Sequence, residues 1–220
     1  YGTLFDVYSV SRLLDELFAG QGARLAALWR DKQIEDTRLC SMSRRYRPFS
    51  ELTRNALRHA CQRCGLVLTA AAERRLLDEY LQLAPFEENL GVLRELKARG
   101  VRTGVLSNGD PPMLEAVIAH AGFDGWLDPV LSAHSVQRFK TDEAVYALGP
   151  QVLDLPARDI LFVSSNCWDA IGATWYGYTT LWINRSQLPL ETLDTEPTRT
   201  GSSLRDVLGF FPPATPRPPS

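Results

Sequence analysis

Polar clusters follow the apolar segments in the second half of the sequence, where strands are predicted to end. Ser107-Asn108-Gly109 follows one apolar segment and Ser164-Ser165-Asn166 follows another. Lys140 falls in a loop before a helical segment, and Tyr1-Gly2-Thr3 opens the sequence. In open α/β sheets, ligands bind beyond the carboxyl ends of the strands. Four polar clusters at one edge of a sheet therefore predict an active site there.

The cysteines and histidines form no pattern typical of a metal or redox centre. Cys61 and Cys64 make a lone Cys-x-x-C inside a helical run, and no second pair of ligands stands at the spacing that a zinc site needs. A redox motif would stand at a strand-to-helix turn. We therefore predict no metal site and interpret the four cysteines as ordinary thiols of a reducing compartment, which favours a cytoplasmic protein.

The elements that must position the polar clusters divide the chain into two parts. From about residue 9 to residue 83, apolar residues recur at helical spacing, which predicts four helices, with Ser50 and Thr69 as N-caps. From about residue 89, helices alternate with short apolar strands at 101–106, 129–131, 160–163 and 179–183. This alternation is typical of parallel βαβ units with helices on both faces of the sheet.

We therefore predict an α/β fold, with a Rossmann-like parallel sheet core and an inserted helical cap subdomain. The core is expected to comprise residues 1–6 and 85–208, and the cap residues 7–84. A single helix is expected over 142–153. Residues 209–220 are rich in proline and are predicted to form a disordered tail.

Composition excludes several functional classes. The 220 residues are 45% hydrophobic, which is ample for one large domain or a domain with an inserted second one. No apolar run approaches the roughly 18 residues of a membrane span, so no membrane partner is expected. Lys and Arg (24) nearly balance Asp and Glu (26) and are interspersed with them, so the basic face of a nucleic-acid-binding protein is not predicted.

Five short motifs stand in a fixed order along the chain. They are Tyr-Gly-Thr-Leu-Phe-Asp-Val at 1–7, Leu-Trp-Arg at 28–30, Leu-Ser-Asn-Gly at 106–109, Phe-Lys at 139–140 with Tyr146, and Val-Ser-Ser-Asn-x-Trp-Asp at 163–169. Together they resemble the L-2-haloacid dehalogenases of the haloacid dehalogenase superfamily. One motif alone is a weak signal, but five in order, within a match from residue 1 to about residue 208, are specific.

The resemblance implies hydrolysis of short-chain (S)-2-haloalkanoic acids to (R)-2-hydroxyalkanoic acids, without a metal or organic cofactor. An aspartate of the family attacks the carbon that bears the halogen, and water then hydrolyses the resulting ester. That aspartate stands two residues before the tyrosine of Tyr-Gly-Thr, so we expect the nucleophile two residues upstream of Tyr1, at the end of an apolar strand. Relatives are commonly homodimers, and the same is expected here.

The resemblance also implies roles for individual residues. Arg30 would stabilise the departing halide, and Ser107 and Lys140 would hold the substrate carboxylate and neutralise the surroundings of the nucleophile. Tyr1, Phe49 and Trp168 would form apolar walls. The expected catalytic residues are Thr3, Arg30, Ser107, Lys140, Tyr146, Ser164, Asn166 and Asp169. The expected substrate-binding residues are Tyr1, Arg30, Phe49, Ser107, Asn108 and Trp168.

Three positions need separate comment. The residue after the family's lysine is usually proline, whereas here it is Thr141, a reasonable helix N-cap. Asp31 stands where many relatives have glutamine, and its charge could weaken the hold of Arg30 on halide or shift the substrate preference. Asp6 imitates a nucleophile motif, but Phe-Asp-Val has its own place in the family pattern and no apolar strand precedes it.

Two other functions remain open from the sequence. The first is a Mg²⁺-dependent phosphatase of the same superfamily, which needs paired carboxylates near residue 163 and an acid where Tyr1 stands. Asp169 is a single carboxylate there, so this function is less favoured. The second is a non-catalytic relative. A chelator would inhibit the phosphatase but not the dehalogenase, and the non-catalytic relative would release neither halide nor phosphate.

Overall fold

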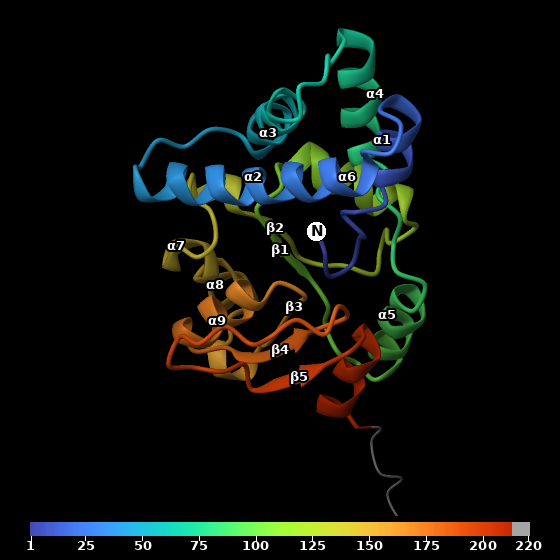
Figure 1. Ribbon diagram of the computed structural model, residues 1–220. Helices are drawn as coiled ribbons and strands as arrows, with labels where there is room; N and C mark the ends of the chain where they lie inside the picture. The colour runs from blue at the N-terminus through green and yellow to red at the C-terminus, as the bar shows by residue number, and fades with distance from the viewer. Residues whose placement is uncertain (213–220) are drawn as a thin grey trace, which may run out of the picture.

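The computed structural model describes residues 1–212, in which a layer of helices lies over an α/β part (Figure 1). The helical layer consists of α1 (Ser11–Leu17), α2 (Gly22–Met42), α3 (Phe49–Arg63) and α4 (Ala70–Tyr80). Below it lie the strands β1 to β5 with helices α5, α7, α8 and α9. The predicted boundaries between core and cap, at residues 6/7 and 84/85, stay a prediction.

The α/β part alternates strands and helices as the apolar pattern predicts. Its helices are α5 (Asn89–Ala98), α6 (Pro111–His120), α7 (Glu143–Tyr146), α8 (Leu148–Leu153) and α9 (Cys167–Tyr176). Its strands are β1 (Val105–Ser107), β2 (Val130–Ser132), β3 (Leu161–Ser164), β4 (Thr179–Ile183) and β5 (Arg199–Gly201). Short 3₁₀ turns are η1 (Ala133–Val136), η2 (Ala157–Asp159) and η3 (Leu204–Phe210).

All strand pairs are parallel, as predicted, but they form two sheets. One sheet contains β1 and β2, and the other has the order β3-β4-β5. Within residues 1–212, no strand joins β1 to β3, and a cavity lined by residues of both strands lies between them. The predicted strand at 101–106 is also shorter than expected, because Pro129 has no N–H and the ladder begins only at Val105 and Val130.

One hydrophobic core joins the helical layer to the α/β part. Trp29 and Leu57 of the helical layer and Phe123 after α6 are all buried in it. Phe5 stacks on Phe123 with ring centroids 5.7 Å apart, and the Trp29 indole N–H donates to the Thr53 carbonyl at 2.7 Å. Because close-packed interiors resist deformation, this shared core fixes α2 and α3 over the ends of the strands.

The structure confirms one predicted helix cap and corrects another. The Thr69 hydroxyl accepts a hydrogen bond from the Ala72 amide at 3.1 Å and caps α4, as expected. Ser50 does not cap α3, because that helix already begins at Phe49. Its cap comes from a distant residue, Asp110, whose carboxylate oxygens accept from the Phe49 amide at 2.8 Å and the Ser50 amide at 2.9 Å.

The helix predicted over 142–153 is instead two short helices, α7 and α8. Pro150 cannot donate a backbone hydrogen bond to the Tyr146 carbonyl, and that carbonyl accepts from the Tyr178 hydroxyl at 2.6 Å. The expected cap by Thr141 is also wrong by one position. The Asp142 carboxylate accepts from the Ala144 amide at 3.0 Å and caps α7.

The predicted tail begins too early. Gly209 and Phe210 complete η3 rather than starting a disordered segment. The carbonyl of Phe211 accepts a hydrogen bond from the Arg99 guanidinium, which ties this end to α5. The hydrogen bonds from Arg99 and the burial of Leu204 and Val207 stabilise η3 despite the neighbouring prolines. The remaining part of the predicted tail, 213–220, lies outside the described residues.

The cap of α3 by the distant residue Asp110 predicts a measurable difference in stability. Asp110→Ala leaves the first two amides of α3 without their acceptor and is expected to lower the free energy of unfolding by about 1–2 kcal/mol. Ser50→Ala is the matched control, because the exposed Ser50 side chain caps nothing, and its effect is expected to stay within about 0.5 kcal/mol. Urea unfolding monitored by circular dichroism measures both. Equal losses would contradict the assignment of Asp110 as the cap.

Candidate active site

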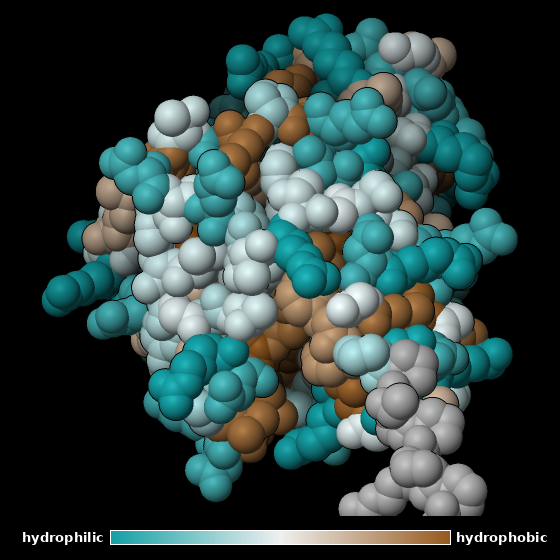
Figure 2. Space-filling view, turned by 90° about the horizontal axis from the view of Figure 1, so that it is seen from below, coloured by the Kyte–Doolittle hydropathy of each residue, from teal (hydrophilic) through white to brown (hydrophobic). Residues whose placement is uncertain are grey.

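A cavity of about 590 Å³ lies between β1 and β3 and reaches α2 and α3 of the helical layer. Most of the residues predicted to form the site line it: Tyr1, Thr3, Arg30, Phe49, Ser107, Asn108, Lys140, Asn166, Trp168 and Asp169. Figure 2 shows the lower face of the molecule, where apolar surface gathers in a hollow. Figure 1 places the first residue between the helical layer and the strands, at the centre of the molecule.

The two remaining predicted residues, Tyr146 and Ser164, lie behind the cavity wall and hold Asp169. The Tyr146 hydroxyl donates to one carboxylate oxygen of Asp169 at 2.8 Å, and the Ser164 hydroxyl donates to the other at 2.9 Å. Burial and the Asp169 charge raise the pKa of Tyr146 well above its usual range, so Tyr146 stays protonated as a donor. These bonds fix the Asp169 carboxylate at the start of α9.

Lys140 completes this cluster as a buried cation. Its ammonium lies 3.0 Å from the Asp169 carboxylate, and the two side chains are only 9% and 6% exposed. Its backbone N–H donates to the Asn108 side-chain oxygen at 2.9 Å, which joins the loop at 140 to the end of β1. The Lys140 ammonium also lies 4.7 Å from the centre of the Phe162 ring. A buried charge needs such partners, and together they hold the Lys140 ammonium in one place.

Arg30 brings a second cation into the cavity from α2. One guanidinium nitrogen donates to the Gln33 side-chain oxygen at 2.7 Å, and the other to the Asn166 side-chain oxygen at 3.4 Å. Within residues 1–212, no carboxylate forms an ion pair with Arg30. The guanidinium is therefore held by neutral groups and keeps its charge available to an anion.

The electrostatic field at the centre of the site is positive. The charge of Lys140 is paired with Asp169, whereas Arg30 has no carboxylate partner within residues 1–212. A cation without a counter-charge favours an anion beside it.

Aromatic side chains form the apolar part of the cavity wall. The Tyr1 ring stacks on Tyr80 at a centroid distance of 5.6 Å and lies 6.0 Å from the Phe49 ring. Trp168 lies on the opposite side, at the boundary with an outer cleft that it also lines, and the Arg38 guanidinium is 5.1 Å from its ring centre. These side chains give the cavity an apolar surface beside its polar groups.

Two hydroxyl groups connect the loops around the cavity. The Thr3 hydroxyl accepts a hydrogen bond from the Ser165 amide at 3.0 Å, so it ties the start of the chain to the end of β3. The Ser107 hydroxyl accepts from the Gly109 amide at 3.1 Å, which leaves its own hydrogen for another acceptor. Asp6 has a different place, because its carboxylate accepts from the Tyr8 amide at 2.9 Å in the turn before α1.

Comparison with known proteins decides the family. The haloacid dehalogenase-like hydrolase family model matches residues 1–177. An (S)-2-haloacid dehalogenase from Pseudomonas sp. (strain YL) is 47% identical over 211 residues, which cover 96% of this chain and 91% of the relative. The chain belongs to the L-2-haloacid dehalogenase family.

Solved structures of this dehalogenase family have the same fold. The L-2-haloacid dehalogenase RSc1362 superposes with a TM-score of 0.94 at 50% identity, covering 96% of this chain and 95% of that one. An L-2-haloacid dehalogenase from Xanthobacter autotrophicus, with chloropropionic acid covalently bound, superposes with a TM-score of 0.88 at 31% identity and covers 94% of this chain and 93% of its own.

Sequence reasoning missed several residues that support this dehalogenase site. Gln33 accepts from Arg30 and from the Tyr80 hydroxyl at 3.2 Å, and donates to the Thr53 hydroxyl at 2.7 Å. Its spacing of three residues from Arg30 on α2 was a usable signal, because such pairs lie on one helix face. Tyr80 and Asp110 gave no such signal, since both reach the site from distant segments.

Two further features are absent from the described part of the dehalogenase chain. Residues 1–212 contain no group of three or more His, Cys, Asp or Glu side chains arranged to hold a metal ion. In the same part of the chain, no helix combines the length and apolar character needed to cross a lipid bilayer.

The buried ion pair predicts strong coupling between Lys140 and Asp169. Asp169→Asn leaves a buried ammonium without its counter-charge, and Lys140→Met leaves a buried carboxylate, so each is expected to cost about 3–5 kcal/mol of stability. The double variant is expected to lose less than the sum by at least about 1.5 kcal/mol. Chemical unfolding of all four proteins measures the cycle. Additive losses would show that the pair is not coupled.

Proposed function

We propose that this protein hydrolyses short-chain (S)-2-haloalkanoic acids to (R)-2-hydroxyalkanoic acids and halide. One observation carries the proposal: two fixed cations, Lys140 and Arg30, line one cavity together with aromatic side chains. A 2-haloacid carries a carboxylate and forms a second anion, the leaving halide. The relatives are named as 2-haloacid dehalogenases, and these names support the same substrate class.

The proposed reaction has two steps. The carboxylate of an aspartate two residues before Tyr1 attacks C2 of the substrate from the side opposite the halogen, so an ester C–O bond forms while the carbon–halogen bond breaks and halide leaves with its electron pair. The backbone nitrogen of Tyr1 lies close enough to Arg30 and Lys140 to be affected by both charges. Two residues span at most about 7 Å, so the proposed nucleophile would lie within reach of both cations.

In the second step, water adds to the carbonyl carbon of the aspartyl ester. The C–O bond between that carbonyl carbon and the substrate oxygen breaks, the oxygen takes a proton, and the 2-hydroxy acid leaves with the configuration inverted. The free carboxylate is thereby regenerated. We assign the orientation of this water to the polar groups at the end of β3, Asn166 and Asp169, supported by Thr3 through its bond to the Ser165 amide.

The remaining residues then have distinct proposed roles. Arg30 stabilises the departing halide, because its guanidinium is fixed by Gln33 and Asn166 and has no ion-pair partner in the described chain. Ser107 and Asn108 bind the substrate carboxylate, together with the ammonium of Lys140. Tyr1, Phe49 and Trp168 exclude water around the carbon–halogen bond. Tyr146 and Ser164 hold Asp169, which in turn holds Lys140.

We also propose the finer points of organisation that the family suggests. The helices α1 to α4 act as a cap over a Rossmann-like core, because Arg30 and Phe49 come from this layer and the polar residues come from the strand ends. The exposed Leu39 and Met42 on α2 give a surface for a homodimer. The four free cysteines are compatible with a reducing, cytoplasmic location.

The proposed reaction is tested by halide release from the full-length protein. With (S)-2-chloropropanoate we expect chloride and (R)-lactate in equal amounts, no turnover of the (R)-substrate, and unchanged rates with excess chelator. A single turnover in H₂¹⁸O is expected to give unlabelled product, since the first oxygen comes from the aspartate carboxylate. Chelator inhibition that Mg²⁺ reverses, with phosphate release, would favour a phosphatase. Release of neither ion would favour a non-catalytic relative.

Substitution of Arg30 tests the halide site. Arg30→Lys keeps the charge but loses the planar fork that binds Gln33 and Asn166 together, so kcat is expected to fall by at least about tenfold, equivalent to about 1.4 kcal/mol. Asp31→Gln is the neighbouring control and is expected to give equal or higher turnover. Steady-state halide release measures both. Unchanged turnover in Arg30→Lys would remove Arg30 from the site.

A further inference from the structure

A second arginine, Arg185, holds the backbone of the segment that carries Tyr1 and Thr3. It lies just after β4, and its two terminal nitrogens donate to the Gly2 carbonyl at 3.4 Å and the Thr3 carbonyl at 3.3 Å. The same guanidinium lies 3.8 Å from the centre of the Phe86 ring. Its side chain is 20% exposed. Arg185 is not among the residues that line the inner cavity; it lines the outer cleft, on which Gly2 and Trp168 also lie.

The segment at residues 2–4 depends on such outside partners. Its carbonyls at Gly2 and Thr3 receive no backbone donor in the described chain, and buried carbonyls need one. The Asn89 side chain supplies a further donor, to the Leu4 carbonyl at 2.8 Å and the Thr3 carbonyl at 3.4 Å. Side chains therefore supply the donors to the Gly2 and Thr3 carbonyls, whereas the Leu4 carbonyl also accepts from the Phe86 amide at 3.2 Å.

Close packing makes the position of this segment critical. Gly2 has a φ of +86°, and a Cβ there would lie 2.9 Å from the Ser165 hydroxyl oxygen, so the segment passes directly against the end of β3. On the same side, the Thr3 hydroxyl accepts from the Ser165 amide. The next residue, Asn166, is the one that binds Arg30. A shift of the segment would therefore move both the wall at Tyr1 and the partner of the halide-binding arginine.

Glu88 fixes Arg185 in this orientation. Its carboxylate accepts from Arg185 at 2.9 Å and from the Leu204 amide at 3.3 Å, and its side chain is 15% exposed. Burial alone would raise the pKa of Glu88, but hydrogen bonds from Arg185 and from backbone amides hold it below its ordinary value. Glu88 is therefore ionised at neutral pH and orients the guanidinium fork toward the two carbonyls.

We infer that Arg185, oriented by Glu88, is a positioning residue for the dehalogenation reaction. It sets the backbone at Gly2 and Thr3 against the end of β3 and thereby aligns the residues that contact the substrate. This inference rests on the proposed function. It predicts that loss of Arg185 lowers the rate of the chemical steps more than the affinity for the substrate, because Lys140, which is proposed to bind the substrate carboxylate, keeps its own partner Asp169.

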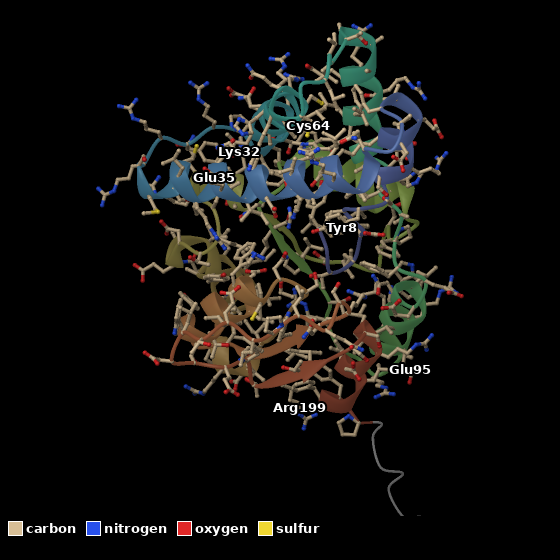
Figure 3. The ribbon with its side chains drawn as sticks, in the orientation of Figure 1. Tyr8, Lys32, Glu35, Cys64, Glu95 and Arg199 are labelled. Carbon is tan, nitrogen blue, oxygen red and sulfur yellow. The ribbon has the colours of Figure 1, made fainter. Side chains whose placement is uncertain are left out.

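The chain offers a matched control in Arg99. Its guanidinium also pairs with a glutamate, Glu95, at 2.9 Å, and donates to two carbonyls, those of Leu208 at 3.1 Å and Phe211. The Arg99 side chain is 16% exposed, close to the value for Arg185. Figure 3 shows Glu95 on the outer side of α5, away from the centre of the molecule. Arg99→Gln therefore removes a similar clamp whose hydrogen bonds go to the end of the described chain and not to the segment at residues 2–4.

The experiment compares Arg185→Gln, Arg185→Lys, Glu88→Gln and Arg99→Gln with the unchanged full-length protein. Chloride release from (S)-2-chloropropanoate gives kcat and KM per folded protein. We expect kcat of Arg185→Gln to fall at least about tenfold, with KM changed less than about threefold. Glu88→Gln is expected to follow it more weakly, and Arg185→Lys to recover part of the rate. Arg99→Gln is expected to keep kcat within about twofold while Tm falls similarly.

Amide hydrogen exchange supplies a readout that does not depend on turnover. The Ser165 amide is expected to lose protection in Arg185→Gln but not in Arg99→Gln, because its acceptor is the Thr3 hydroxyl. Equal kcat in Arg185→Gln and Arg99→Gln, or unchanged Ser165 protection in both, would overturn the inference. If the unchanged protein released no halide, the proposed function would fail, while the exchange comparison would still decide whether Arg185 positions the segment.

Discussion

The buried contact between Lys140 and Asp169 constrains the whole site. Two opposite charges can lie in an interior only if each is paired and its remaining polar atoms are satisfied. Asp169 meets this condition with three donors from separate segments, the loop at 140, helix α7 and strand β3. The loop at 140 is in turn bonded to Asn108 at the end of β1. The ends of the two sheets are thus held together by one charge pair and its neutral partners.

The helical layer supplies what the strand ends lack. Arg30 and Phe49 reach the cavity from α2 and α3, and each of these helices is bonded to the α/β part at the point of contact. Arg30 donates to Asn166, and the start of α3 is capped by Asp110. The polar contacts lie beside a continuous apolar core, so the two layers are kept in a fixed register. The proposed roles of Arg30 at the halide and Lys140 at the substrate carboxylate depend on this fixed arrangement of the two layers.

Local patterns could predict the elements but not their ends. Alternating strands and helices correctly indicated parallel pairing, and Thr69 was recognisable as a cap because its acceptor role is local. The break between α7 and α8 required the knowledge that the Tyr146 carbonyl has a tertiary donor in Tyr178. The gap between the two sheets is also a tertiary feature, since pairing depends on which strands meet in space.

The sequence by itself determined the family, the parallel α/β class and most residues that line the cavity, because motifs and hydrophobic spacing are properties of short segments. Only the tertiary structure decided what fixes those residues. The cap of α3 by Asp110, the hydrogen bond from Tyr80 to Gln33 and the clamp formed by Arg185 and Glu88 join segments up to about 100 residues apart. Such contacts leave no periodic trace in the sequence, because each depends on a single pair of side chains brought together by the folded backbone.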